Sequence, residues 1–276
     1  MQDPLESPWP PTSGSVAHRA RHWYQLGHEP GLPGGHVLYP HGLAHLVIVL
    51  DGGPCEPAVF GLRTRPVEVG VPVGARSLDV CMTPRVAHAV FGLPMNRLVD
   101  APVELREATG RAGERLVGAL RAASSWPEVF VLADRFLRDR LGGYVPETDV
   151  VTRAWRLLAG RGGRLPVAEL CRRTGMSERL LELRFREQVG LPPKASARLL
   201  RLWRALRLLA RRRPGARVAI ECGFYDQAHL ARDCKALTGR RPSWFARADR
   251  AVRQHVEHFG FVQDWLVGVD DHDEGG

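Results

Sequence analysis

Two stretches in the second half of the chain carry cationic, amide and small side chains at helical spacing. Arg can pair with two acceptor atoms of guanine, Gln can pair with adenine, and Ala leaves room for a thymine methyl group. Residues three and four positions apart share one face of a helix. Each stretch therefore predicts a helix face that could read the edges of base pairs. The residues concerned are Arg179, Glu182 and Arg186 in the first stretch, and Gln227, Ala228, Ala231, Arg232 and Lys235 in the second.

A glycine and a capping side chain come before each stretch. Gly175 precedes Ser177, and Gly223 precedes Asp226. Glycine accepts a positive φ and lets the chain turn sharply between two helices. Ser and Asp accept hydrogen bonds from the free N–H groups in the first turn of a helix. The pattern predicts two helix-turn-helix units whose second helices present their outer faces.

The two units are copies of one pattern and are joined by one long helix. The helix opens at Pro193, and its apolar stripe includes Leu202, Trp203 and Leu206. Two ordinary helical hairpins are the alternative interpretation, but two basic copies in register favour groove binding. The matched pairs are Ser177 with Asp226, Leu181 with Leu230, Phe185 with Cys234, Gly190 with Gly239, and Pro193 with Pro242.

Charge is distributed unevenly along the chain. Residues 151–253 hold 25 Lys and Arg against 8 Asp and Glu, a net charge of +17. Residues 1–150 carry −2, and residues 254–276 carry −6. A basic module of this kind is typical of a protein that binds a polyanion, although a general bias toward Arg would raise the charge as well.

The C-terminal region resembles the DNA-binding domain of AraC-type bacterial transcription regulators. The stretch GMSERLLELRFREQVGLPPK is similar to the first unit of that family, and IECGFYDQAHLARDCKALTGRRP is similar to its second and more diagnostic unit. The resemblance implies two helix-turn-helix units, at about 152–193 and 212–250, within a domain at 150–252. It implies that the chain is a sequence-specific regulator bound to double-stranded DNA, and not an enzyme.

Positions on the two helices divide into two groups of expected DNA contacts. By position, Arg179 and Glu182 are expected to face base edges in the first unit, and Gln227, Ala228, Ala231 and Arg232 in the second. Arg186, Lys235, Arg240 and Arg241 are expected to contact phosphates. His229 lies near the buried side of its helix, where a packing role is expected.

Two residues depart from the family pattern. Leu183 stands where the first recognition helix usually has Arg, so we expect weaker reading of guanine there, with a thymine methyl group as its remaining partner. Cys234 stands where an aromatic core residue is usual, so the second small core is expected to be less filled.

The N-terminal region has a different pattern. From about His36 to Val90 short apolar runs predict strands, and helical patterns follow from Pro94, whereas the first 35 residues are expected to hold little ordered structure. LYPHGLAHLVIVLDG and MTPRVAHAVFGLP resemble a sensor-like domain that precedes this DNA-binding module. We expect an α+β chain, with a cupin-like β-rich domain and trailing helices at 1–145, an all-α domain at 150–252 and an acidic tail at 254–276.

The main alternative is a cupin-like metal enzyme fused to the DNA-binding module. His36, His41 and His45 lie close together, but no HxH pair with a downstream Glu has usable spacing, so neither a metal nor another cofactor is expected. Cys55 and Cys81 do not supply the cysteine cluster of a DNA-repair module. No membrane span and no secretory signal is evident, and unpaired cysteines favour the cytoplasm. The family likeness allows an unknown small-molecule effector and a homodimer.

Overall fold

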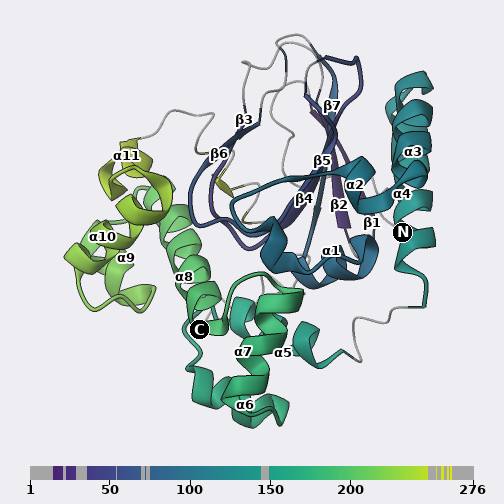
Figure 1. Ribbon diagram of the computed structural model, residues 1–276. Helices are drawn as coiled ribbons and strands as arrows, with labels where there is room; N and C mark the ends of the chain where they lie inside the picture. The colour runs from purple at the N-terminus through teal and green to yellow at the C-terminus, as the bar shows by residue number, and fades with distance from the viewer. Residues whose placement is uncertain are drawn as a thin grey trace, which may run out of the picture.

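The computed structural model describes residues 15–20, 23–28, 36–53, 55–69, 72, 75–143, 149–247, 253, 256–257, 260 and 262. An antiparallel β domain comes first in the chain, and helices follow, so the predicted α+β class is confirmed. Figure 1 shows the β domain between a pair of its own helices on one side and the C-terminal helices on the other.

The N-terminal domain contains two antiparallel sheets. The larger has six strands in the order β1-β2-β7-β4-β5-β8, and β3 pairs with β6 in the smaller. The strands are β1 (Ser15–Ala20), β2 (Trp23–His28), β3 (His36–Leu38), β4 (Ala44–Val49), β5 (Ala58–Phe60), β6 (Val67–Val69), β7 (Ser77–Met82) and β8 (Val103–Glu104).

Both faces of the central strands β4 and β7 are buried, and they differ in chemistry. Leu46, Ile48 and Val80 face the main apolar core, which the trailing helices cover. Because strand side chains alternate between faces, the intervening residues of both strands lie on the opposite face. There, Val47 and Val49 pack against the small sheet, whereas His45 and Asp79 bring polar groups into the interior.

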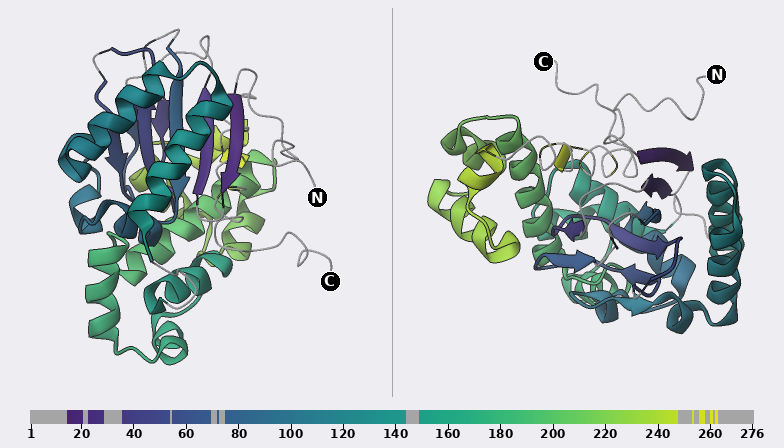
Figure 2. Two further views of the ribbon diagram at one scale, coloured as in Figure 1. Left: turned by 90° about the vertical axis from the view of Figure 1, so that its right-hand side faces the viewer. Right: turned by 90° about the horizontal axis from the view of Figure 1, so that it is seen from above.

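The trailing helices cover the first face of the sheet. Helices α3 and α4 lie along it, as both views in Figure 2 show. The helices are α1 (Pro84–Phe91), the 3-10 turn η1 (Met95–Leu98), α2 (Leu105–Thr109), α3 (Arg111–Ala122) and α4 (Trp126–Leu141).

Two expectations for this domain are wrong. The sequence predicts strands as far as Val90, but α1 begins at Pro84. Thr83 caps this helix through its side chain, and Pro at the first helical position favours a helix start. Residues 15–20 and 23–28 form paired strands where little order was expected. Their pairing with each other and with β7 is long-range information that a count of Pro, Gly and Ser does not contain.

The C-terminal domain is entirely helical within the described residues. Its helices are α5 (Val150–Gly160), α6 (Val167–Thr174), α7 (Glu178–Gln188), α8 (Pro193–Ala210), α9 (Gly215–Glu221), α10 (Gln227–Thr238) and α11 (Pro242–Arg247). Helix α8 is the predicted connecting helix, and its stripe of Leu199, Leu202, Trp203, Leu206 and Leu209 is buried.

The N-terminal domain contacts both halves of the C-terminal domain. Leu62 belongs to the apolar core formed around α5, α6 and α7. Tyr39 packs against Phe245 of α11, with ring centroids 5.8 Å apart, and belongs to the second core, around α8, α9 and α10. Val256 and Val262 are also buried in that second core, whereas residues 263–276 of the acidic tail lie outside the described residues.

Among the described residues, no helix is both long and apolar enough to span a bilayer.

Candidate nucleic-acid interface

The first helix-turn-helix unit has the predicted turn and cap. Helix α6 ends at Gly175, whose φ of 73° lies in the left-handed region. Ser177 accepts a hydrogen bond from the N–H of Leu180 and begins α7. Leu181 and Phe185 are fully buried on the inner side of α7. The packing of this inner side leaves the opposite side of α7 at the surface.

The second unit repeats the arrangement with a tighter cap. Gly223 turns the chain after α9 with a φ of 76°. The carboxylate of Asp226 accepts a hydrogen bond from the N–H of His229 at 2.6 Å and begins α10. Phe224 plugs the small core, and Leu230 and Cys234 are buried on the inner side of α10. Each predicted cap and core residue of this unit is therefore confirmed.

Helix α8 holds the two units together. The guanidinium of Arg201 donates to the carbonyl of Gly163, which lies in the turn after α5, and lies 6.0 Å from the ring of Phe224 in the second unit. Arg198 donates to the carboxylate of Asp233 on α10 at 2.8 Å. One rigid helix therefore carries polar contacts to both units as well as the apolar stripe.

The side chains expected to contact DNA lie at the surface. All are exposed except Ala231, which is half-buried because it lies at the edge of the α10 packing face. The exposed members are Arg179, Glu182, Arg186, Gln227, Ala228, Arg232, Lys235, Arg240 and Arg241.

The exposed cations differ in their present partners. Arg186 donates to Glu182 at 2.8 Å, one turn away on α7, so these two groups partly satisfy one another before any DNA is bound. Within the described part of the chain, no carboxylate forms an ion pair with Arg179 or Arg232. These two guanidinium groups keep their donors available for a ligand.

Arg240 is already engaged at the boundary between the domains. Its guanidinium lies 5.2 Å from the ring of Trp244 in a cation–π contact. It also acts on the Tyr39 hydroxyl: burial raises the pKa of Tyr39, and the nearby Arg240 partly opposes that rise. A phosphate contact by Arg240 would therefore compete with a contact to the N-terminal domain.

His229 packs as expected. Its ring lies edge-on to Phe224, with centroids 5.4 Å apart, and its Nδ1 accepts a hydrogen bond from the N–H of Tyr225.

The helix surfaces also expose apolar groups. Leu183 is 61% exposed on α7, and Tyr225, just before the α10 cap, is 91% exposed. Sequence reasoning gave Tyr225 no role. The sequence does contain a signal for Tyr225. It lies between the core residue Phe224 and the N-cap residue Asp226, so its ring cannot enter the small core that Phe224 fills.

A second group of polar side chains is buried in the N-terminal domain. His41 and His45 lie with their Nε2 atoms 3.2 Å apart, and Nδ1 of His45 is 2.8 Å from Asp79. Cys81 lies 3.6 Å from the same Nδ1. Sequence reasoning grouped the two histidines with His36, whose side chain lies outside the described part of the structure. It considered Cys81 only with Cys55, and it missed both Asp79 and the position of Cys81 beside His45. Their alternation in SLDVCM was the available signal, since it places both on one strand face.

The hydrogen bonds assign the protons of the two histidines. Nδ1 of His41 accepts from the N–H of Leu43, so its Nε2 carries the proton and donates to Nε2 of His45. Nδ1 of His45 therefore carries a proton and donates to Asp79. Burial lowers the pKa of His45, although Asp79 opposes this effect, and burial lowers the pKa of the neighbouring Arg63 to about 10.

One comparison with known protein families agrees with the geometry of the C-terminal domain. A family profile described as a helix-turn-helix domain matches residues 170–248. A search of curated proteins found no match.

Two crystal structures of ToxT from Vibrio cholerae are similar to this chain. The structure from O395 is 10% identical, covers 85% of this chain and 98% of its own, and has a TM-score of 0.43. The structure with bound unsaturated fatty acid, from strain SCE256, is 10% identical, covers 82% and 95%, and has a TM-score of 0.42.

The C-terminal domain has two units, each with a glycine turn, a capped second helix and an exposed outer face, and the profile match covers most of both units. The chain therefore carries a helix-turn-helix domain over residues 170–248.

Proposed function

We propose that α7 and α10 enter successive major grooves on one side of a DNA duplex. The observation that supports this most directly is that each helix has a buried inner side, an exposed outer side and a contact to the same helix, α8. Successive major grooves are about 34 Å apart along the duplex. A single rigid connection between the two recognition helices would hold them at one fixed spacing.

We propose that base reading falls to two small sets of side chains. Arg179 and Glu182 serve the first unit, and Arg232 is the principal guanine reader of the second, since it has five donors and no ion pair within the described residues. Gln227, Ala228 and Ala231 lie at the start of α10, where a recognition helix comes nearest to the bases.

The remaining polar groups on this surface are proposed as phosphate contacts. They position the protein on the duplex without reading its sequence. We add Tyr225 to this set, because its exposed side chain lies beside the N-terminus of α10 and its hydroxyl can donate to a phosphate oxygen. The set is Arg186, Tyr225, Lys235, Arg240 and Arg241.

For the N-terminal domain we propose a controlling role and no catalysis. It reaches the first unit through Leu62 and the second through Tyr39. A small-molecule effector or a partner copy that shifted this domain would therefore change the spacing of the two recognition helices. The buried polar groups of its sheet are closed to a substrate in solution.

In vitro selection of bound duplexes from a random pool tests sequence-specific binding. We expect an enriched site with two half-sites one helical turn apart, and specific binding tighter than random binding by about 10³-fold or more. Log Kd should also depend steeply on log salt, with a slope magnitude of about 3.6 if the four cationic phosphate contacts form. Failure of selection to enrich any sequence would leave only non-specific binding and would reject the proposal.

A further inference from the structure

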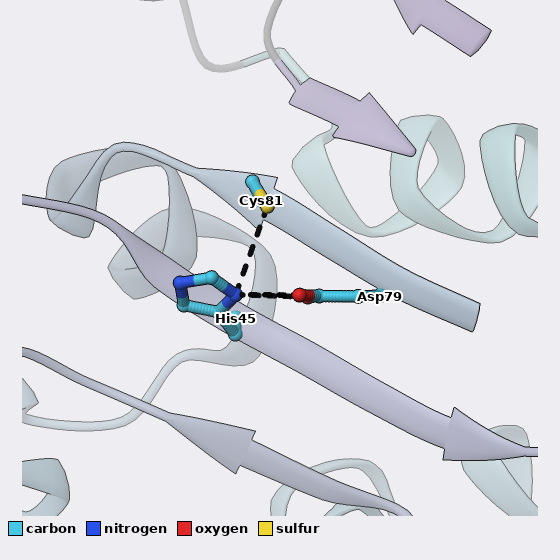
Figure 3. A group of neighbouring side chains, drawn as sticks. All are labelled: His45, Asp79 and Cys81. Carbon is cyan, nitrogen blue, oxygen red and sulfur yellow. Dashed lines mark hydrogen bonds and ion pairs between the residues drawn. The ribbon is translucent and has the colours of Figure 1, made fainter. Parts of the chain in front are cut away.

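The strand register brings three metal-binding side chains to one point of the N-terminal sheet. His45 of β4 lies directly opposite Cys81 of β7, and Asp79 lies two residues before Cys81. These positions share one face of the sheet. Figure 3 shows the ring of His45 facing both Asp79 and Cys81 from the neighbouring strand. All three side chains are buried, and their ligand atoms lie within 4.8 Å of one another.

We propose that His45, Asp79 and Cys81 bind one divalent transition-metal ion, with Zn²⁺ as the best match. Imidazole, carboxylate and thiolate are the three ligand types that zinc takes in proteins. At usual bond lengths a tetrahedral zinc ion separates its nitrogen and sulfur ligands by about 3.6 Å. Nδ1 of His45 and Sγ of Cys81 already lie 3.6 Å apart.

The carboxylate needs a small movement to complete this geometry. Oδ1 of Asp79 lies 2.8 Å from Nδ1 of His45, as a direct hydrogen bond requires. Tetrahedral zinc separates nitrogen and oxygen ligands by about 3.4 Å. A shift of about half an ångström, within reach of a side-chain rotation, would make room for the ion. A water molecule would then fill the fourth position, as in zinc sites with three protein ligands.

The charges around the cluster suit a divalent cation. Arg63 is buried beside Asp79 and Cys81, and Asp100 also acts on it electrostatically. With Cys81 as a thiolate, the three anions and the one guanidinium sum to −2, which a divalent ion neutralises. Binding would release the thiol proton of Cys81 and move the single ring proton of His45 from Nδ1 to Nε2.

The site also touches the helix that joins the two DNA-binding units. With the metal on Nδ1 of His45, the single proton of that ring lies on Nε2, which then donates to His41. His41 cannot then also accept from the N–H of Leu43 at Nδ1, because a neutral imidazole has only one acceptor nitrogen. The ring of His41 packs edge-on against Trp203 of α8, with centroids 5.2 Å apart. Loading the site would therefore disturb a contact on α8.

Cobalt substitution tests the proposal on the full chain. The protein is treated with a chelator and a non-thiol reductant, freed of both, and then titrated with Co²⁺. We expect one Co²⁺ per chain, a thiolate-to-cobalt charge-transfer band in the near ultraviolet, and loss of that band when Zn²⁺ is added. Absence of the band in the unaltered protein would overturn the proposal, including the case in which Co²⁺ binds elsewhere without a thiolate.

Two matched variants locate the thiolate. Cys81→Ser should abolish the charge-transfer band and weaken Co²⁺ binding by more than about 100-fold, since losing a direct ligand costs more than losing a supporting group. Cys222→Ser is the control, because Cys222 is also a buried free thiol and lies in the same apolar cluster. It should keep the band and the affinity. Retention of the band in folded Cys81→Ser protein, or its loss in folded Cys222→Ser protein, would place the metal at another cysteine.

Discussion

Arg198 on the connecting helix α8 donates a hydrogen bond to the carboxylate of Asp233 on α10, with Nη2 and Oδ1 2.8 Å apart. The carboxylate is buried, whereas the Arg198 side chain is 41% exposed. His229 lies 3.8 Å from the other carboxylate oxygen. Helix α10 is thus held against α8 by a charge-assisted contact in addition to its apolar packing.

Removal of this contact should loosen the second unit. Arg198→Ala leaves the buried Asp233 carboxylate without its main donor, so we expect the free energy of unfolding to fall by about 1–3 kcal/mol in urea titrations. Arg213→Ala is the matched control, because Arg213 is exposed beyond the end of α8. It should change stability by less than about 0.5 kcal/mol. Equal losses in the two variants would mean that the Arg198–Asp233 pair contributes nothing specific.

The turn after α5 should tolerate no side chain. Gly163 has a φ of 72°, and a Cβ placed there would overlap the carbonyl oxygen of Ala197 in α8. Gly239 has a similar φ of 69° but open space around it. Gly239→Ala should therefore cost only the left-handed backbone penalty, about 1 kcal/mol, whereas Gly163→Ala should cost at least about 3 kcal/mol because backbone atoms must also move. Thermal unfolding of both variants compares the two costs, and similar Tm values would contradict this packing.

Acid should weaken the contact between the domains at Asp149. Burial raises the pKa of Asp149. Hydrogen bonds from Arg85 of α1 and from the N–H of Thr152 together lower it by more than burial raises it, so the net pKa is lowered. A lowered folded pKa means that the contribution to stability is complete above the unfolded value of about 3.9 and is lost as the pH falls through the folded value.

The variant Asp149→Asn isolates this effect, because Asn can still cap α5 but carries no charge. The difference in free energy of unfolding between the two proteins should be constant above about pH 5 and shrink toward zero below about pH 4. A difference that grows on acidification would contradict the assigned direction of the pKa shift.

Most of the turns, caps and helix faces of the C-terminal domain could be predicted from sequence patterns that span only a few residues. Glycine turns, side-chain caps and the apolar spacing of each helix act within a few residues, so Gly175, Ser177 and Asp226 could be assigned from neighbours in the sequence. The exposure of the outer faces followed from the buried inner faces. Contacts with DNA remain predictions, because exposure makes a contact accessible without showing the partner.

The features that could not be predicted from the sequence depend on contacts between residues far apart in the chain. The cap at Thr83 is local and could have marked α1, but the placement of Leu62 in the core of the first unit depends on how two domains meet. The position of Cys81 beside His45 is also long-range information, because it depends on the register between β4 and β7. Histidine spacing alone pointed to His36, His41 and His45 and could not bring a ligand from a strand more than 30 residues away.

Base reading by the second unit can be separated from phosphate binding on the same helix. Arg232→Ala should reduce the affinity for the selected duplex by about 10-fold to 100-fold while changing the affinity for random duplex much less, since a bidentate contact to guanine contributes about 1–3 kcal/mol of discrimination. Lys235→Ala, on the same exposed helix, should weaken both duplexes alike and reduce the salt slope by about 1. Fluorescence anisotropy with the two duplexes at several salt concentrations measures both quantities. If Arg232→Ala lowers both affinities equally, Arg232 binds a phosphate, and the recognition of guanine must be assigned to another side chain of the interface.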